Sequence, residues 1–147
     1  MASVRVFLSF DLEHDRDLCE LLVEQARRGA SFAVANRSEG GAVDAPWTLR
    51  VRGRITASDE VVVICGEHTD AAARVSAELR IAQEEKKPYM LLWGRRELMC
   101  KKPRGARIDD GMYSWTAEQL DQQILAVLRR SRQAQVPEGM KRVTPRP

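Results

Sequence analysis

Glu78 stands within the segment GEHTDAAARVSAELRIA (66–82), beside an apolar stripe that starts at Ala71 and repeats through Leu79. On a 3.6-residue repeat, Glu78 lies about 60° from the centre of this stripe, at the boundary of the expected helix face. A carboxylate there could act as a working acid, or it could be an ordinary solvated helix charge. Spacing alone favours the solvated charge, because glutamates at helix boundaries are common.

His68 and Trp47 are two further candidates for contact with a ligand. His68 follows an apolar, strand-like run and could reach a ligand, although a histidine in a turn before a helix is more often structural or solvated. Trp47 could be a stacking platform beside a polar loop, although an aromatic residue that opens an amphipathic helix is usually part of the core. The sequence leaves both alternatives open.

The segment SFDLEHD carries an acidic cluster of Asp11, Glu13 and Asp15 after the first strand-like run. Such a cluster could hold Mg²⁺ in a response-regulator receiver, but a receiver also needs a phosphoacceptor aspartate at the end of its third strand, where this chain has Ile-Cys-Gly. The chain also lacks GxGxxG, GxxxxGK[ST] and GxSxG, which argues against the common dehydrogenases, P-loop NTPases and serine hydrolases. With two histidines and three widely spaced cysteines, no metal site is expected, and the cysteines should be reduced thiols.

Alternating apolar and amphipathic segments predict the elements that must position these residues. The expected strands are 4–10, 31–35, 60–65 and 89–93, with a short fifth strand near 112–115. The expected helices are 14–28 with Asp11 as N-cap, 47–56, 70–85, and a last helix that Thr116 caps. The pattern predicts an α/β fold, a doubly wound parallel sheet of four to five strands with helices on both faces. Ligands of such sheets bind beyond the carboxyl ends of the strands.

Length and composition limit the class of protein. The 147 residues are 44% hydrophobic and 31% charged, and no apolar run is long enough to cross a bilayer, so we expect one cytoplasmic domain over 1–134 without membrane contact. The segment 135–147 is basic and contains three prolines, and we expect it to be disordered. Nucleic acid is not an expected partner, because the basic stretch 95–107 has no interleaved aromatic residues.

Four motifs, in order, resemble the TIR superfamily. They are FLSF at Phe7–Phe10, a polar loop at 36–46 in the place of the BB loop, SDEVVVICGEHT, and RVSAE at 74–78, where Glu78-Leu79 matches the family's Glu-Leu or Glu-Ile pair. Arg74 stands where the family has tryptophan. The resemblance covers about residues 3–94 and is closer to the bacterial TIR-like branch that includes signalling subunits of Thoeris anti-phage defence. It implies a flavodoxin-like, TIR-like fold.

The resemblance further implies NAD⁺ chemistry. TIR enzymes cleave the nicotinamide–ribose bond and release ADP-ribose or cyclise it to a cyclic ADP-ribose-type signal, with NAD⁺ as substrate and neither cofactor nor metal. Glu78 would be the catalytic carboxylate, which stabilises an oxocarbenium-like transition state. The residues expected to contact substrate are Ser9, Phe10 and Asp11 after the first strand, Arg37, Ser38 and Trp47 around the BB loop, and His68.

The resemblance also implies partners. We expect a homo-oligomer formed through the BB loop or helix surfaces, and a separate effector protein that responds to the product. A competing hypothesis is a non-catalytic interaction module that associates through its BB loop, with Glu78 as a solvated charge. A third is a flavodoxin-like flavin or nucleotide binder, but SFDLEHDRD is too acidic for the phosphate-binding loop of that class.

Overall fold

The computed structural model describes residues 3–134. The strands are β1 (Val4–Ser9), β2 (Phe32–Arg37), β3 (Glu60–Cys65), β4 (Tyr89–Trp93) and β5 (Met112–Tyr113). The helices are α1 (Arg16–Arg27), α2 (Ala45–Thr56), the 3₁₀ helix η1 (Thr69–Ala71), α3 (Ala73–Glu84) and α4 (Ala117–Ala134). The strands at 60–65 and 89–93 have the predicted bounds, and the short fifth strand is present.

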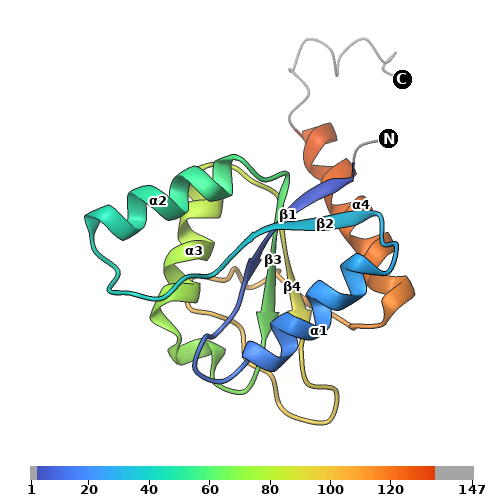
Figure 1. The fold of residues 1–147 in the computed structure, drawn as a ribbon, viewed down its shortest axis with the longest axis horizontal. Helices are drawn as coiled ribbons and strands as arrows, with labels where there is room; N and C mark the ends of the chain where they lie inside the picture. The colour runs from blue at the N-terminus through green and yellow to red at the C-terminus, as the bar shows by residue number, and fades with distance from the viewer. Residues whose placement is uncertain (1–2, 135–147) are drawn as a thin grey trace.

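The five strands form one parallel sheet in the order β2-β1-β3-β4-β5. Parallel neighbours need crossover connections. The helices α1, α2 and α3 supply the first three, whereas the connection from β4 to β5 contains no helix. In Figure 1, α2 and α3 lie on one side of the sheet and α1 and α4 on the other. The predicted α/β fold, a doubly wound parallel sheet with helices on both faces, is therefore confirmed.

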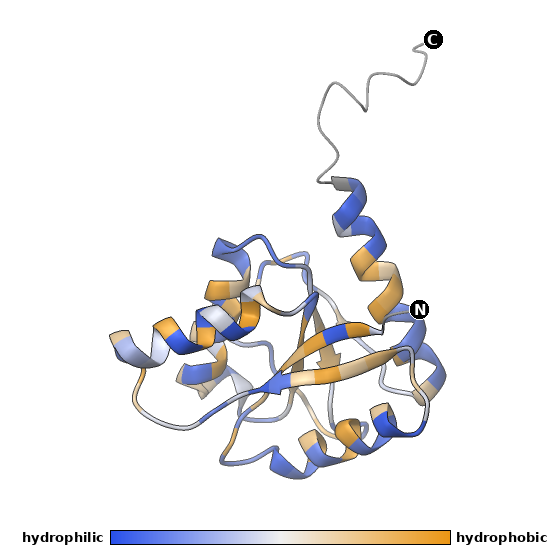
Figure 2. Cartoon of the chain, turned by 45° about the horizontal axis from the view of Figure 1, so that its top comes forward, coloured by the Kyte–Doolittle hydropathy of each residue, from blue (hydrophilic) through white to orange (hydrophobic). Residues whose placement is uncertain are grey.

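The alternation of side chains along β1 divides the core into two layers. Val6 and Leu8 pack with α1 and α4, whereas Phe7 packs with α2 and α3. The strands are the most apolar part of the cartoon in Figure 2, as expected for a sheet that is covered on both faces. Ser9 is on the same side of β1 as Phe7, so this hydroxyl faces α3.

The start of α1 differs from the prediction. Asp11 was expected to cap this helix, and that prediction is wrong, because α1 begins at Arg16 and Asp15 occupies the N-cap position. The Asp11 carboxylate instead accepts hydrogen bonds within its own turn, from the Glu13 amide at 3.0 Å and from the His14 ring at 2.7 Å. Local side-chain bonds of this kind compete with helix initiation, and they delay the helix by one turn.

The other boundaries shift by a few residues. The second strand continues to Arg37, and α2 begins at Ala45 because the Asp44 carboxylate caps the Trp47 amide at 2.9 Å. The BB loop of the structure is therefore the segment 38–44. Helix α3 follows η1 and starts at Ala73 rather than at 70. The predicted cap at Thr116 is confirmed, since its hydroxyl accepts from the Gln119 amide.

Two further expectations concern the chain as a whole. All three cysteines are free thiols with buried side chains, as predicted. Within residues 3–134, no helix combines the length and the apolar character that crossing a bilayer requires. The predicted disorder of 135–147 concerns residues outside the described part of the chain.

Candidate active site

Glu78 is fully buried, with 0% of its surface exposed. The interpretation of this residue as a solvated boundary charge is therefore wrong. The helical repeat predicts burial only for the face of α3 that packs on the sheet. In the folded protein, the end of β1 and the BB loop cover the flank of α3 as well, so a boundary position becomes an interior one.

Two serine hydroxyls, one at the end of β1 and one at the start of the BB loop, hold the Glu78 carboxylate. Ser9 Oγ donates to Glu78 Oε1 at 2.6 Å, and Ser38 Oγ donates to the same oxygen at 2.7 Å. The Phe10 amide donates to Ser38 Oγ at 3.0 Å and fixes that hydroxyl. Glu78 Oε2 has no hydrogen-bond partner among residues 3–134. One carboxylate oxygen is thus anchored, while the other stays unpaired.

The environment shifts the acidity of Glu78. Burial raises its pKa to about 7, because the charged form loses its hydration. The hydrogen bonds from Ser9 and Ser38 and the nearby charge of Arg74 act in the opposite direction, and Glu39 adds a smaller increase. A carboxylate with this pKa is present in both protonation states near neutral pH, which is typical of residues that handle protons or charge in active sites.

A cleft of about 450 Å³ opens beside this cluster. Its walls come from the loop after β1, the BB loop, and the segment from His68 to the start of α3. The lining residues are Phe10, Asp11, Glu13, His14, Gly41, Ala42, Val43, His68, Ala71, Ala72, Ala73, Arg74 and Val75. The chain leaves β1 for β2 on one side and then returns from β2 past β1 to β3 on the other side, so the cleft lies at the switch point where such folds bind ligands.

Glu78 is a neighbour of the cleft rather than part of its lining. Phe10 lines the cleft and is joined to Glu78 through Ser38, and Val75 precedes Glu78 by one turn of α3. Arg74 also lines the cleft, and its guanidinium donates to the Gly41 carbonyl at 2.9 Å. The BB loop is therefore fixed to α3 at the point where the cleft meets the buried carboxylate.

The cleft contains a pair of stacked imidazoles, which we call the imidazole pair. The rings of His14 and His68 have their centroids 4.1 Å apart and are tilted by 33°. His14 Nδ1 lies 2.7 Å from Asp11 Oδ2, and this hydrogen bond raises the pKa of His14. His68 was predicted as a ligand contact and does line the cleft. His14 was not predicted, although its spacing of three residues from Asp11, in a loop after a strand, is a usable signal.

Four predicted contact residues do not line the cleft. Ser9 and Ser38 instead hold Glu78, and Arg37 and Trp47 lie away from it. Arg37 belongs to β2 and pairs with Glu20 of α1 at 2.9 Å, because a register shift in β2 aligns Arg37 with Leu8, whose side chain faces the α1 layer. Trp47 is 1% exposed and packs in the core between the sheet and α2, with its indole N–H donating to the Glu39 carbonyl at 3.3 Å. The stacking-platform interpretation of Trp47 is therefore wrong, and the core interpretation is correct.

An ion-pair cluster supports the loop that carries the imidazole pair. Arg95, from the connection after β4, binds the carboxylates of Asp15 at 3.1 Å and Asp17 at 2.9 Å and the His14 carbonyl at 2.9 Å. Asp15 is 1% exposed, and burial raises its pKa while Arg95 opposes that increase. A Cβ at position 66 would overlap the Asp15 carboxylate, which explains the glycine there. No local sequence pattern indicates this cluster, because Arg95 is 78 to 80 residues away from the two aspartates.

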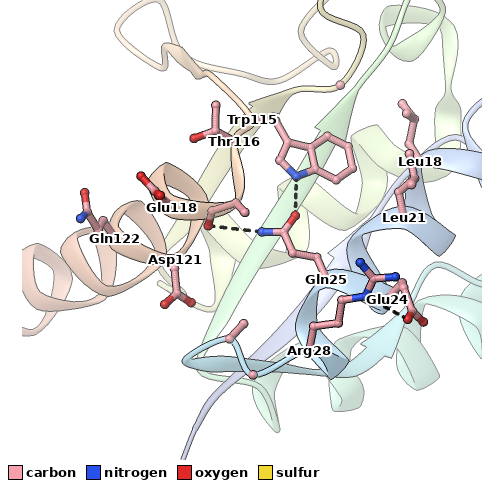
Figure 3. Close-up of a pocket in the computed structure, with 14 residues that line it drawn as sticks. Leu18, Leu21, Glu24, Gln25, Arg28, Trp115, Thr116, Glu118, Asp121 and Gln122 are labelled. Carbon is pink, nitrogen blue, oxygen red and sulfur yellow. Dashed lines mark hydrogen bonds and ion pairs between the residues drawn. The ribbon is translucent and has the colours of Figure 1, made fainter.

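A larger hollow of about 820 Å³ lies elsewhere, between α1 and the start of α4 (Figure 3). The polar side chains that line this hollow form hydrogen bonds between elements of the fold. The Trp115 indole donates to Gln25 at 2.9 Å, and the Gln25 amide donates to the Ala117 carbonyl at 3.4 Å. Asp121 accepts from both the amide and the hydroxyl of Ser31. Among its lining residues none is a buried titratable group, so the smaller cleft is the better candidate for chemistry.

Comparison with known proteins agrees with this architecture. No family model matches the chain, and no curated protein matches it. Among solved structures, the crystal structure of a prokaryotic SEFIR domain superposes with a TM-score of 0.52 at 17% sequence identity. The match covers 99% of this chain and 98% of that domain. The protein therefore has the TIR-like, flavodoxin-type fold that the SEFIR domain also has.

Proposed function

We propose that this protein cleaves the bond between nicotinamide and ribose in NAD⁺, with Glu78 as the catalytic carboxylate. The observation that carries the proposal is the geometry of Glu78. Two hydroxyls anchor one oxygen, the other oxygen has no partner among residues 3–134, and the residue lies beside a cleft at the switch point of the sheet. A fully buried carboxylate without a partner on one oxygen is costly. The two hydroxyl donors and the adjoining cleft are the features that favour a chemical role for this one.

The proposed reaction needs little more than one well-placed negative charge. Nicotinamide is a good leaving group, and its departure leaves an oxocarbenium-like ribose. Ser9 and Ser38 hold Glu78 Oε1, so that Oε2 is available to stabilise this cation and to orient a ribose hydroxyl. The ionised form is the active one in this mechanism, and its fraction increases as the pH rises through about 7.

Access to Glu78 requires the BB loop to move, because the carboxylate has no exposed surface. The loop contains consecutive glycines, and Gly41 has a φ of 109°, a conformation that glycine adopts without strain. Opening the loop would exchange the hydrogen bonds of Ser38 with Glu78 and of Gly41 with Arg74, and the ion pairs of Glu39 with Arg50 and Arg54. We propose that assembly of several copies opens this loop, so that a dilute monomer would show little turnover.

The product belongs to the same proposal. Water at the ribose cation gives ADP-ribose, and attack by a group of the same substrate gives a cyclic ADP-ribose-type signal. We propose that this product acts on a separate effector in anti-phage defence, as the resemblance to the TIR-like branch suggests. Mass spectrometry of the product separates hydrolysis from cyclisation.

A second candidate function is a non-catalytic interaction module. The specific observation in its favour is the closed state of Glu78 together with exposed apolar side chains near the BB loop. Val43 is 42% exposed and Leu49 is 74% exposed, and such residues are typical of docking surfaces when they cluster. In this alternative the buried carboxylate contributes only to the structure.

The test is nicotinamide release from NAD⁺, followed by HPLC at high protein concentration with and without a crowding agent. We compare the wild type with Glu78→Gln and, as a matched control, with Glu60→Gln, the same exchange at a second buried glutamate far from the cleft. We expect Glu78→Gln to lose about 10³-fold of the rate and Glu60→Gln to stay within twofold. Circular dichroism verifies that all three proteins are folded.

Two results would count against the enzyme. Equal rates for wild type and Glu78→Gln would remove the assigned role of the carboxylate. No release from any folded variant, in dilute or crowded solution, would favour the interaction module, which cross-linking of wild type against a Val43→Asp variant would then examine.

A further inference from the structure

The imidazole pair combines features that suit a flat, positively charged ring. Stacked rings leave an outer face on each imidazole, and both His14 and His68 line the cleft. Aromatic faces attract cations, and planar cations gain stacking contact in addition. The pair therefore offers a surface that a neutral sugar or a phosphate would not use.

The charge of the cleft lining also favours a cation. Asp11 and Glu13 line the cleft beside the imidazole pair, and Arg74 is the only arginine or lysine in the lining. The Arg74 guanidinium is bound to the Gly41 carbonyl on the opposite wall. When both imidazoles are neutral, the lining has one negative charge in excess and attracts cations. A proton on His14, whose pKa is raised by Asp11, would cancel that excess, so the attraction is expected at alkaline pH.

We propose that the imidazole pair, with Asp11 and Glu13, binds a cationic heteroaromatic ring of the pyridinium class, such as the charged end of an oxidised nicotinamide dinucleotide. The inference deepens the proposed function and rests on it for the identity of the ligand. The Asp11 carboxylate orients His14 through the 2.7 Å hydrogen bond and supplies negative charge beside the ring. The cleft volume of about 450 Å³ lies within the range of small-molecule sites.

The imidazole pair adjoins the same cleft as the candidate catalytic residue, Glu78. The imidazole pair and the Glu78 cluster both adjoin the cleft, one through the loops after β1 and β3 and the other through Phe10 and α3. A pyridinium held on the pair would have its attached ribose directed along the cleft toward Glu78. The pair would then select the charged form of the ring, which is the form that can depart from ribose.

Binding of fragments tests this without any turnover. We would titrate the full chain at pH 8.5, well above the ordinary pKa of histidine, with N1-methylnicotinamide, nicotinamide, adenosine and ADP-ribose, and follow binding by NMR and calorimetry. We expect the permanently charged N1-methylnicotinamide to bind about fivefold more tightly than neutral nicotinamide. Tighter binding of adenosine or of ADP-ribose at the imidazole pair would overturn the proposal.

Single substitutions test whether the imidazole pair is the binding site. His68→Ala removes one ring and should weaken N1-methylnicotinamide binding about fivefold, whereas His68→Phe keeps an aromatic face and should retain most of the affinity. Asp11→Asn should reduce the preference for the charged ring about threefold. Glu84→Gln is the matched control, since Glu84 is an exposed glutamate at the last turn of α3 and lines no part of the cleft, and the affinity of this variant should stay within twofold. Unchanged binding in a folded His68→Ala would refute the assignment.

The two proposals can fail separately. Selective binding of the charged ring without any NAD⁺ cleavage would support the cation site and count against the enzyme. Cleavage of NAD⁺ that depends on Glu78 but is unchanged in KM by His68→Ala would support the enzyme and count against the cation site.

Discussion

Two buried glutamates occupy opposite ends of the same sheet. Glu78 adjoins the carboxyl ends of β1 and β2, where Ser9 and Ser38 donate to its carboxylate. Glu60 is the first residue of β3, at the amino end of the sheet, and both of its oxygens lack a partner within residues 3–134. Burial raises the pKa of Glu78 to about 7 and that of Glu60 to about 9, with Arg130 opposing the increase at Glu60.

The difference between them shows that burial alone does not make a functional acid. Within residues 3–134, Glu60 has no hydrogen-bond donor, and it lines neither of the two clefts described above. With a pKa of about 9 it is neutral at neutral pH and fills space. Glu78 has two donors that favour its charged form and a cleft beside it. Partners and access, rather than a raised pKa, therefore distinguish the candidate catalytic residue.

The largest expected difference between the two glutamates is in how each makes the free energy of unfolding depend on pH. Both glutamates bind protons more tightly in the folded state than in the unfolded state, where the pKa is near 4.5. Their contribution to stability is complete below pH 4.5 and decreases as the pH rises through the folded pKa. Between pH 7 and pH 9 the remaining decrease should come from Glu60, at roughly 2 kcal/mol.

Urea unfolding at a series of pH values measures this. Glu60→Gln should remove the decrease between pH 7 and pH 9, and Glu78→Gln should retain it. If both variants show the wild-type slope over that interval, the assignment of the shifted proton to Glu60 is incorrect.

The next effect concerns the serine donors. Ser38→Ala removes one hydrogen bond to the charged form of Glu78 and should raise its pKa further. We expect the rising limb of the pH–rate profile to move upward by roughly half a unit to one unit, with about a fivefold lower rate at pH 7. The control is Ser76→Ala, on the same helix, because the Ser76 hydroxyl has no partner among the described residues. An unchanged profile in Ser38→Ala would show that the hydroxyl does not act on Glu78.

The smallest effect concerns the BB loop. Arg74→Gln removes the hydrogen bond to the Gly41 carbonyl, which should loosen the loop that covers Glu78 but leave Glu60 untouched. Hydrogen exchange of the amides in 38–44 should become about threefold faster, as expected for the loss of one partly exposed hydrogen bond. Arg80→Gln, an exposed position on α3, serves as the control. Equal exchange in the two variants would mean that Arg74 does not restrain the loop.

Some features were predictable because they depend on local pattern. The all-apolar run of β3 and the caps at Thr116 and Asp44 are short-range features, and so the strand positions and the fold class follow from the sequence. The boundary errors occurred where side chains compete with the backbone. Asp11 bonds its own turn instead of capping α1, which no helical repeat reveals.

The sequence by itself determined the alternation of strands and helices, and hence which loops meet at the carboxyl edge of the sheet, because apolar periodicity fixes the faces that must be buried. Only the tertiary structure decided that Glu78 is interior, that Trp47 belongs to the core and that His14 stacks on His68. These properties depend on residues 40 to 69 positions apart along the chain, such as Ser38 and Ser9 around Glu78. The burial and the hydrogen bonds of a side chain depend on residues that are distant in the sequence. A local sequence pattern contains no information about those residues.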